Sequence, residues 1–161
     1  MALVQNLDRP DRDTKRRLRL WLRLYAATSM IEREMRRFLR ARFATTLPRF
    51  DLMAALERAP EGLSMGDLSR RLMVTGGNVT AVVDSLERDG LVGRRPSAPD
   101  RRTSYVALTA RGRAAFAAMA REHEQWIDRL LADVPDDEID RLAGLLADLK
   151  HGAELTAERE R

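Results

Sequence analysis

The stretch from Leu47 to Phe116 decides the fold: LPRFDLMAALERAPEGLSMGDLSRRLMVTGGNVTAVVDSLERDGLVGRRPSAPDRRTSYVALTARGRAAF. Its first part predicts a short helix that begins near Pro48 and ends at the turn Pro60-Glu61-Gly62. The apolar stripe of this helix has helical spacing and consists of Leu52, Ala55, Leu56 and Ala59. Ser64 and Asp67 then form an acidic variant of the capping box, which predicts another helix directly after a tight break.

A further helix is predicted from Thr75, a suitable N-cap, to about Asp89, with Gly90 as the C-terminal stop. One face of this helix is apolar and carries Val79, Val82, Val83 and Leu86. The opposite face carries small and polar side chains, which are Asn78, Ala81, Ser85 and Arg88. This division suits a helix that is fixed on a scaffold and approaches another surface closely.

After Gly90 the period of the pattern changes to two, which predicts strands at Leu91–Arg95 and Thr103–Leu108. The turn-forming sequence Pro96-Ser97-Ala98-Pro99-Asp100 separates them, so the segment predicts a β-hairpin. Basic residues follow the hairpin to its tip, and these are Arg94, Arg95, Arg101 and Arg102. Such a hairpin can be a solvated surface feature or a contact for a polyanion.

Helical patterns flank this central stretch on both sides. An amphipathic helix is predicted from about Lys15 to Phe43, and Thr109 caps a helix that runs to about Ala132. Pro135 interrupts the pattern before a sixth helix, whose apolar residues are Ile139, Leu142, Leu145, Leu146 and Leu149. The polar tail from 151 to 161 is expected to fray.

Length and composition exclude several classes of protein. A chain of 161 residues is one domain, or one domain with an appendage. It has no cysteine, and its two histidines, His123 and His151, do not have metal-ligand spacing, so neither a metal site nor a cofactor is expected. No paired-carboxylate or nucleotide-loop signature is present, which argues against an enzyme. Without a signal-peptide pattern or an apolar run of membrane-spanning length, we expect a soluble, cytoplasmic protein with no membrane partner.

The net charge of +4 conceals an uneven distribution. Residues 1–42 contain 12 basic and 5 acidic residues, whereas residues 114–161 contain 6 basic and 12 acidic residues. Nearly all basic residues are arginine, which suits bidentate phosphate contacts but can equally reflect genome base composition. The pattern favours a polyanion-binding element attached to a segment that does not touch the polyanion.

The order of helix, helix, polar-faced helix and basic hairpin predicts a winged helix-turn-helix, mainly α with a small β-hairpin wing. The stretch from Leu47 to Phe116 resembles the MarR family of bacterial transcription regulators. The most specific part of the resemblance is DGLV at 89–92, DRR at 100–102 and LTxxG at 108–112. The flanking helices match the dimerisation elements of that family by length and order.

The resemblance implies where the chain would contact DNA. The recognition helix maps onto Thr75 to Arg88, and its candidate contacts are Thr75, Gly76, Gly77, Asn78, Thr80, Ala81, Ser85 and Arg88. The wing adds Arg94, Arg95, Asp100, Arg101 and Arg102, with Asp100 holding the wing through one arginine while the other lies in or near the minor groove. Asn78 can donate to and accept from an adenine edge. Gly76 and Gly77 depart from the larger polar residues that are common at this place in the family.

The resemblance further implies a homodimer with a dimerisation helix at 1–46, a DNA-binding lobe at 47–109 and further dimerisation helices at 110–161. It would bind double-stranded DNA at a palindromic operator and act as a ligand-relieved repressor of a catabolic operon. An aromatic acid or its CoA thioester is the expected small-molecule effector. By default, the arginines among its candidate contacts belong to exposed helix surface and the other residues to the core. The candidate contacts are Arg16, Arg19, Trp21, Arg23, Tyr25, Phe50, Met53, His123 and Trp126.

Two other functions remain open at this point. A winged helix can bind a partner protein with the same helix, and salt-insensitive partner binding would indicate that role. A nucleoid-type protein would bind DNA without an effector.

Overall fold

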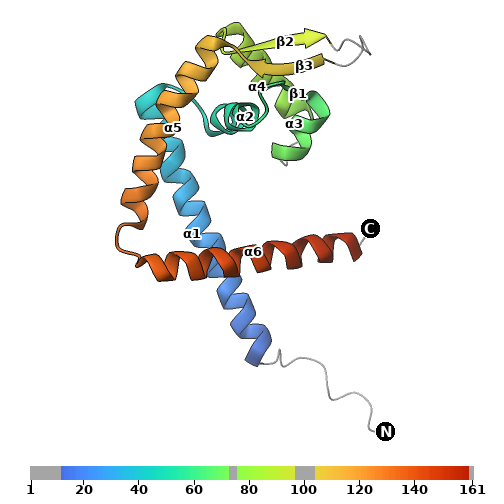
Figure 1. Ribbon diagram of the computed structural model, residues 1–161. Helices are drawn as coiled ribbons and strands as arrows, with labels where there is room; N and C mark the ends of the chain where they lie inside the picture. Colours follow the sequence, from blue (N-terminus) through green and yellow to red (C-terminus); the bar gives the residue numbers. More distant parts are fainter. Residues whose placement is uncertain (1–11, 73–75, 97–103, 160–161) are drawn as a thin grey trace. The chain divides into compact units, whose positions relative to one another are not determined.

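The structure, a computed structural model, describes residues 12–72, 76–96 and 104–159 (Figure 1). The helices are α1 (Arg12–Phe43), α2 (Leu47–Glu57), α3 (Met65–Leu72), α4 (Gly76–Arg88), α5 (Ala110–Leu131) and α6 (Asp136–Arg159). The strands are β1 (Leu63–Ser64), β2 (Val92–Pro96) and β3 (Ser104–Leu108). The mainly helical fold with a small antiparallel sheet that the sequence predicted is therefore confirmed.

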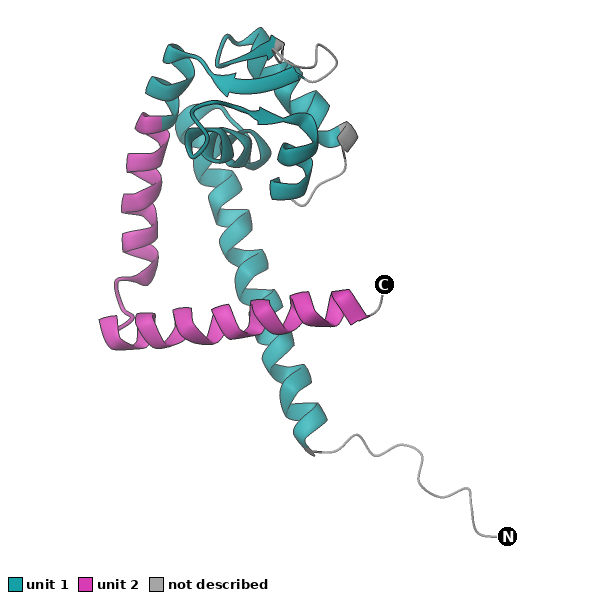
Figure 2. Cartoon of the chain, turned by 45° about the vertical axis from the view of Figure 1, so that its right-hand side comes forward, with its two compact units in different colours: residues 1–116 teal, residues 117–161 magenta. Residues whose placement is uncertain are grey.

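The chain divides into two compact units, Met1–Phe116 and Ala117–Arg161 (Figure 2). The first unit contains α1 to β3 and the start of α5, and the second contains the rest of α5 and α6. The functional division into a DNA-binding lobe between two dimerisation regions stays a prediction.

The sheet of the first unit has the strand order β1-β3-β2 with antiparallel pairing throughout. Strands β2 and β3 form the predicted hairpin, in register from Val92 opposite Leu108 to Pro96 opposite Ser104. Strand β1, which pairs Leu63 with Val106, was not predicted because two residues are too short to show a period of two.

The core of the first unit gathers the apolar faces of its helices around this sheet. The predicted inner face of α4 is confirmed, since Val79, Val83 and Leu86 have almost no exposed surface, while Val82 is half-buried. The other fully buried large side chains are Leu39, Leu52, Met53, Leu56, Leu68 and Val106. α2, α3 and α4 are thus held together by burial of the apolar stripes that the sequence predicts for α2 and α4 and of Leu68 on α3.

The predicted caps fix where the helices begin. The amide of Asp67 donates to the Ser64 hydroxyl at 3.1 Å, and that hydroxyl donates to the Asp67 carboxylate at 2.6 Å. The serine hydrogen bond lowers the pKa of Asp67. At the start of α5, the amide of Gly112 donates to the Thr109 hydroxyl at 2.9 Å, as an N-cap requires.

The expectation that the tail from 151 onward frays is wrong, because α6 includes residues 151–159 and ends at Arg159. This segment is rich in good helix formers. The Lys150 ammonium nitrogen also lies 3.9 Å from a carboxylate oxygen of Glu154, one helical turn away. Polar composition alone was therefore a poor indicator of fraying. No helix in the described ranges is both long enough and apolar enough to span a membrane.

Candidate nucleic-acid interface

Helix α4 presents a polar outer surface over its first turns. Asn78, Thr80 and Ala81 are exposed, while Val79 between them is buried. The structure therefore holds α4 by its apolar face and leaves these predicted contacts accessible. The backbone of Gly76 and Gly77 forms the first turn of the helix, whereas Thr75 lies outside the described residues.

The C-terminal half of α4 is fastened to α2 by Arg49. Its guanidinium donates to the Ser85 hydroxyl at 2.6 Å and to the Asp89 carboxylate at 2.5 Å. These contacts lower the pKa of Asp89, with the hydrogen bond from Arg49 as the largest cause. Ser85, a predicted DNA contact, is half-buried and receives this bond. Sequence reasoning missed Arg49 because nothing local links residues so far apart in the chain.

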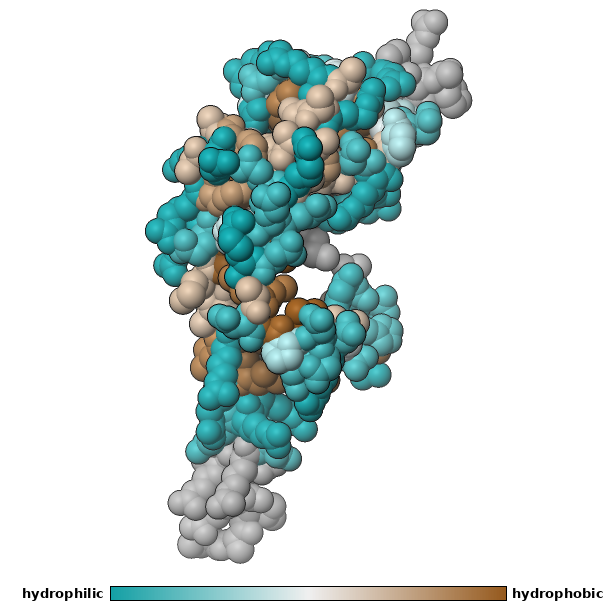
Figure 3. Space-filling model, turned by 60° about the vertical axis from the view of Figure 1, so that its left-hand side comes forward, coloured by the Kyte–Doolittle hydropathy of each residue, from teal (hydrophilic) through white to brown (hydrophobic). Residues whose placement is uncertain are grey.

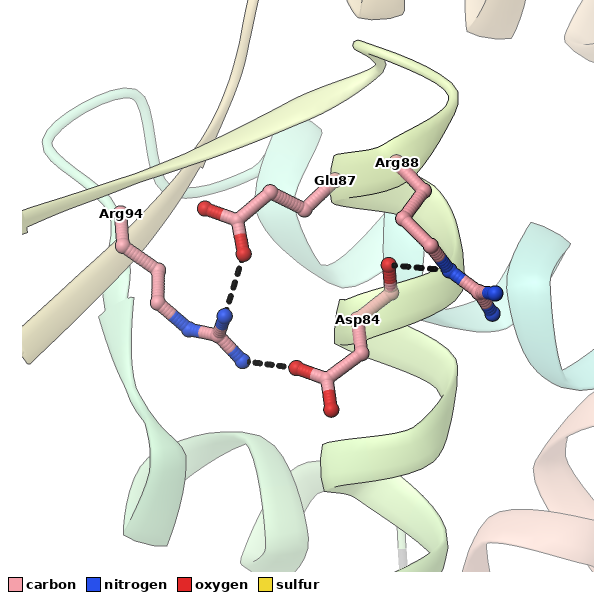
Figure 4. Close-up of polar contacts among 4 residues, drawn as sticks. All are labelled: Asp84, Glu87, Arg88 and Arg94. Carbon is pink, nitrogen blue, oxygen red and sulfur yellow. Dashed lines mark hydrogen bonds and ion pairs between the residues drawn. The ribbon is translucent and has the colours of Figure 1, made fainter.

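A second arginine links α4 to the hairpin (Figure 4). Arg94 on β2 donates from one guanidinium nitrogen to Asp84 and from another to Glu87. The two carboxylates raise the pKa of Arg94 above its already high value, with the Asp84 hydrogen bond as the first cause. Arg88 bonds back to the Asp84 backbone carbonyl at 3.4 Å and is exposed.

The described part of the hairpin ends at the pair Pro96 and Ser104. Arg95 is exposed and lies opposite Tyr105 in the register. Successive side chains of a strand point to opposite faces, so Arg95 and Arg94 face different ways. The predicted wing-tip residues Asp100, Arg101 and Arg102 lie outside the described residues.

The motifs DGLV and LTxxG meet at the base of the hairpin. Gly90 has a φ of 68°, the left-handed conformation expected for the residue after a helix. Thr109 donates from its amide to the Leu91 carbonyl at 3.0 Å and from its hydroxyl to the Gly90 carbonyl at 2.8 Å. A Cβ atom on Gly112 would lie 1.8 Å from the Leu91 carbonyl oxygen. These contacts set the direction in which the hairpin leaves α4.

The candidate effector residues have different environments. Met53 is fully buried and Phe50, which packs against Phe116 with ring centroids 5.5 Å apart, is nearly so. Trp21 and Tyr25 on α1 are exposed and stacked at 5.6 Å. The three predicted arginines on α1 are also exposed and are Arg16, Arg19 and Arg23.

In the second unit, His123 and Trp126 are half-buried and stacked at 6.3 Å. Burial lowers the pKa of His123, and the nearby Glu124 opposes that shift. The two candidate effector residues of the second unit therefore lie against each other.

Two hollows in the first unit adjoin α1. One, of about 310 Å³, lies between α1, α2 and α4 and includes Glu32, Asp51 and Asn78 in its lining. Burial raises the pKa of Asp51, Glu32 raises it further, and Arg36 opposes both. The other hollow, of about 530 Å³, follows α1 and is lined by Tyr25, Ser29, Glu32, Arg33, Arg36, Arg37 and Arg40. No sequence motif marked either hollow.

Large apolar side chains remain exposed on both units, as the brown surface in Figure 3 illustrates. On α1 they are Leu18, Leu20, Trp21, Leu22, Tyr25, Met30 and Ile31. On α6 they are Leu142, Leu145, Leu146, Leu149 and Leu155, and no residue of α6 is buried. Patches of this kind mark surfaces that bind another protein, a membrane or a ligand.

Comparison with known proteins gives consistent results. The model of the MarR family matches residues 45–103. The transcriptional activatory protein BadR of Rhodopseudomonas palustris is 36% identical over 104 residues, which are 63% of this chain and 59% of that protein. The transcriptional repressor YetL of Bacillus subtilis is 32% identical over 98 residues, 61% of this chain and 59% of YetL. The matched region thus spans about three fifths of the length of these curated relatives.

Solved structures match over more of the chain. FabT of Streptococcus pneumoniae, crystallised in complex with DNA, is 26% identical with a TM-score of 0.72 over 85% of this chain and 96% of that one. A MarR family transcriptional regulator from Silicibacter pomeroyi is 31% identical, with a TM-score of 0.75 over 90% of this chain and 99% of that one. On this sequence and structural likeness, the chain belongs to the MarR family of transcription regulators.

Proposed function

We propose that the protein is a dimeric transcription regulator that binds double-stranded DNA in a sequence-specific manner. The observation that carries the proposal is the outer surface of α4, where Asn78, Thr80 and Ala81 are exposed on a helix whose other face is buried. A helix held in this way can enter the major groove, and its amide and hydroxyl groups can read base edges. The likeness to FabT, whose structure contains DNA, supports the same use of the fold.

The dimer is part of this proposal. The exposed leucines of α6 and the apolar residues of α1 need a covering surface, and a second copy offers the same apolar stripes. Two α4 helices related by a two-fold axis would read half-sites about one turn of DNA apart, so the operator would be palindromic.

Fluorescence anisotropy tests DNA binding directly. The protein is titrated onto a duplex from the promoter region beside its own gene, with random duplex as competitor, at two salt concentrations. We expect specific binding that weakens as salt rises, because arginines displace counterions from phosphates. Asn78→Ala should lower the preference for the promoter duplex, whereas Arg70→Ala on the exposed side of α3 should not. Equal binding to both duplexes would favour a nucleoid-type role, and salt-insensitive binding of a protein partner instead of DNA would favour an interaction module.

The proposed effector is an aromatic acid or its CoA thioester, and its binding would relieve repression. The hollow along α1 supports this chemistry, since it combines the Tyr25 ring with the guanidinium groups of Arg33 and Arg40. Arginine forms bidentate bonds with carboxylates and phosphates, and a ring can stack on tyrosine. The relatives include both an activator and a repressor by name, so the direction of regulation needs its own test.

Calorimetry with free aromatic acids and their CoA thioesters tests the effector. We expect binding by at least one of these compounds and its loss in Arg33→Ala/Arg40→Ala, while Arg58→Ala, at the exposed position that follows α2, leaves it intact. If none of the compounds binds, the effector proposal is wrong. Addition of the bound compound to the protein–DNA complex should release DNA if the protein is a ligand-relieved repressor, and a tighter complex would contradict that role.

A further inference from the structure

Arg94, a candidate DNA contact, forms ion pairs with two carboxylates of the protein itself. Its two terminal guanidinium nitrogens are engaged by Asp84 and Glu87, which lie one turn apart on α4 (Figure 4). A guanidinium binds phosphate best through the same outward-facing fork of N–H groups. In this arrangement that fork is already occupied by two carboxylates, so Arg94 is poorly placed to bind the DNA backbone.

The same contacts connect α4 and β2 a second time, beyond the short turn that joins them in the chain. Between the end of α4 at Arg88 and the start of β2 at Val92, the chain turns at Gly90 in the left-handed conformation. Arg94 reaches back across this turn and fixes β2 to the last two turns of α4. Arg49 fastens the same end of α4 to α2 through Asp89, so the helix end is held from both sides.

A helix in the major groove and a wing on the flanking backbone contact the same duplex only if their separation is fixed. Resting on the proposed function, we propose that Arg94 is a positioning residue that sets the angle of the wing against α4 and thereby the sequence specificity of DNA binding. It acts through Asp84 and Glu87 and not by contact with DNA. Both arginines are exposed, but Arg95 lies on the other face of β2, away from the carboxylates that pair with Arg94, and is therefore the better placed of the two to bind phosphate.

The test compares Arg94→Ala, Asp84→Asn/Glu87→Gln and the matched control Arg95→Ala in the full-length protein. The probes are a duplex selected by the wild-type protein from a randomised library and an unselected duplex. For each variant the ratio of the two affinities and the dependence of affinity on salt are measured. A phosphate contact contributes about 0.9 to the slope of log K against log salt.

We expect Arg94→Ala to lower the affinity ratio about tenfold with an unchanged salt slope, since no phosphate contact is lost. Asp84→Asn/Glu87→Gln should lower the ratio in the same way, although it removes negative charge and leaves Arg94 in place. Arg95→Ala should weaken binding to both duplexes alike and reduce the slope. A smaller slope in Arg94→Ala, or an unchanged ratio in the double variant, would overturn the inference.

Amide hydrogen exchange, measured without DNA, tests the positioning role of Arg94 even if the proposed function is wrong. If wild type does not distinguish the two duplexes, the proposed sequence-specific function fails by itself. The positioning role is then judged by amide exchange in Arg94→Ala. Faster exchange across residues 92–96 and 104–108, with no shift in the midpoint of urea unfolding, supports it. Exchange equal to that of wild type shows that Arg94 does not hold the hairpin, and the inference is wrong.

Discussion

Gly112 has the tightest surroundings among the seven glycines whose side-chain space the structure describes. A Cβ atom there would lie 1.8 Å from the carbonyl oxygen and 2.8 Å from the carbonyl carbon of Leu91, and both are backbone atoms that cannot rotate away. We therefore predict that Gly112→Ala lowers the free energy of unfolding by about 2–3 kcal/mol, as overpacking of a close contact does. Urea unfolding followed by circular dichroism measures this loss.

Gly144 on α6 is the matched control for this substitution. A Cβ atom on Gly144 would meet nothing within 4 Å. Gly144→Ala should therefore stabilise its helix by about 0.5–1 kcal/mol, because alanine has the better helix propensity. Equal effects of the two substitutions would refute the steric explanation of the LTxxG motif.

Asp51 gives a pH dependence whose sign can be stated. Burial and Glu32 raise its pKa above the ordinary value of 3.8, so the folded protein holds this proton to a higher pH than the unfolded chain does. The contribution of Asp51 to stability consequently falls as pH rises from the ordinary pKa through the raised one. At pH 7, Asp51→Asn should raise the free energy of unfolding, by less than about 1 kcal/mol for a partly exposed group.

Urea unfolding at pH 7 and at acidic pH checks this sign. The difference between Asp51→Asn and wild type should shrink as pH falls toward 3.8, where the wild-type carboxyl is also neutral. Asp133→Asn, at an exposed position between α5 and α6, serves as the control and should have little effect at either pH. Destabilisation by Asp51→Asn at pH 7 would contradict the assigned shift.

At the scale of elements, periodicity predicted most of the first unit. The apolar stripe of α4, the Thr109 cap and the hairpin follow from spacing that any short window contains. The contacts of Arg49 with Asp89 and of Arg94 with Asp84 could not be predicted, because tertiary packing brings these charges together. The sequence therefore did not distinguish Arg94 from Arg95, although Arg94 pairs with Asp84 and Glu87 and Arg95 lies on the other face of β2.

The end of α1 offers a test of how a helix is terminated. Ala44 has a φ of 49°, which is left-handed, and its amide donates to the Arg40 carbonyl at 3.2 Å, while the Thr45 amide donates to the Leu39 carbonyl at 3.4 Å. A side chain makes this conformation costly, so glycine is the usual residue here. We predict that Ala44→Gly raises the free energy of unfolding by about 0.5–1 kcal/mol.

Ala114→Gly, at an exposed position within α5, is the control and should have the opposite sign, with a loss of about 0.5–1 kcal/mol. Both variants are measured by thermal and urea unfolding. If Ala44→Gly destabilises the protein as much as Ala114→Gly does, the left-handed termination of α1 is not retained in solution.

At the scale of the whole molecule, the stability of α6 is not accounted for by packing within a single chain. It is a helix of 24 residues in which no residue is buried, and an isolated helix is only marginally stable in water. Leu142, Leu145, Leu146 and Leu149 form one stripe along it, and each is 43–58% exposed. Burial of a leucine contributes about 1.5–3 kcal/mol, so covering this stripe would supply the stability that the helix lacks.

We accordingly predict that Leu145→Asp/Leu149→Asp converts a dimer into a monomer, measured by sedimentation equilibrium. Since both leucines are exposed in the single chain, the first unit should keep its fold, and circular dichroism should show at most the loss of α6 helicity. The control Ala147→Asp adds a charge on the other side of α6 and should leave the dimer intact. Binding to a palindromic duplex should fall in parallel with dimerisation, because a monomer reaches only one half-site. A double variant that stays dimeric would place the interface elsewhere and leave the exposed stripe of α6 for a different partner.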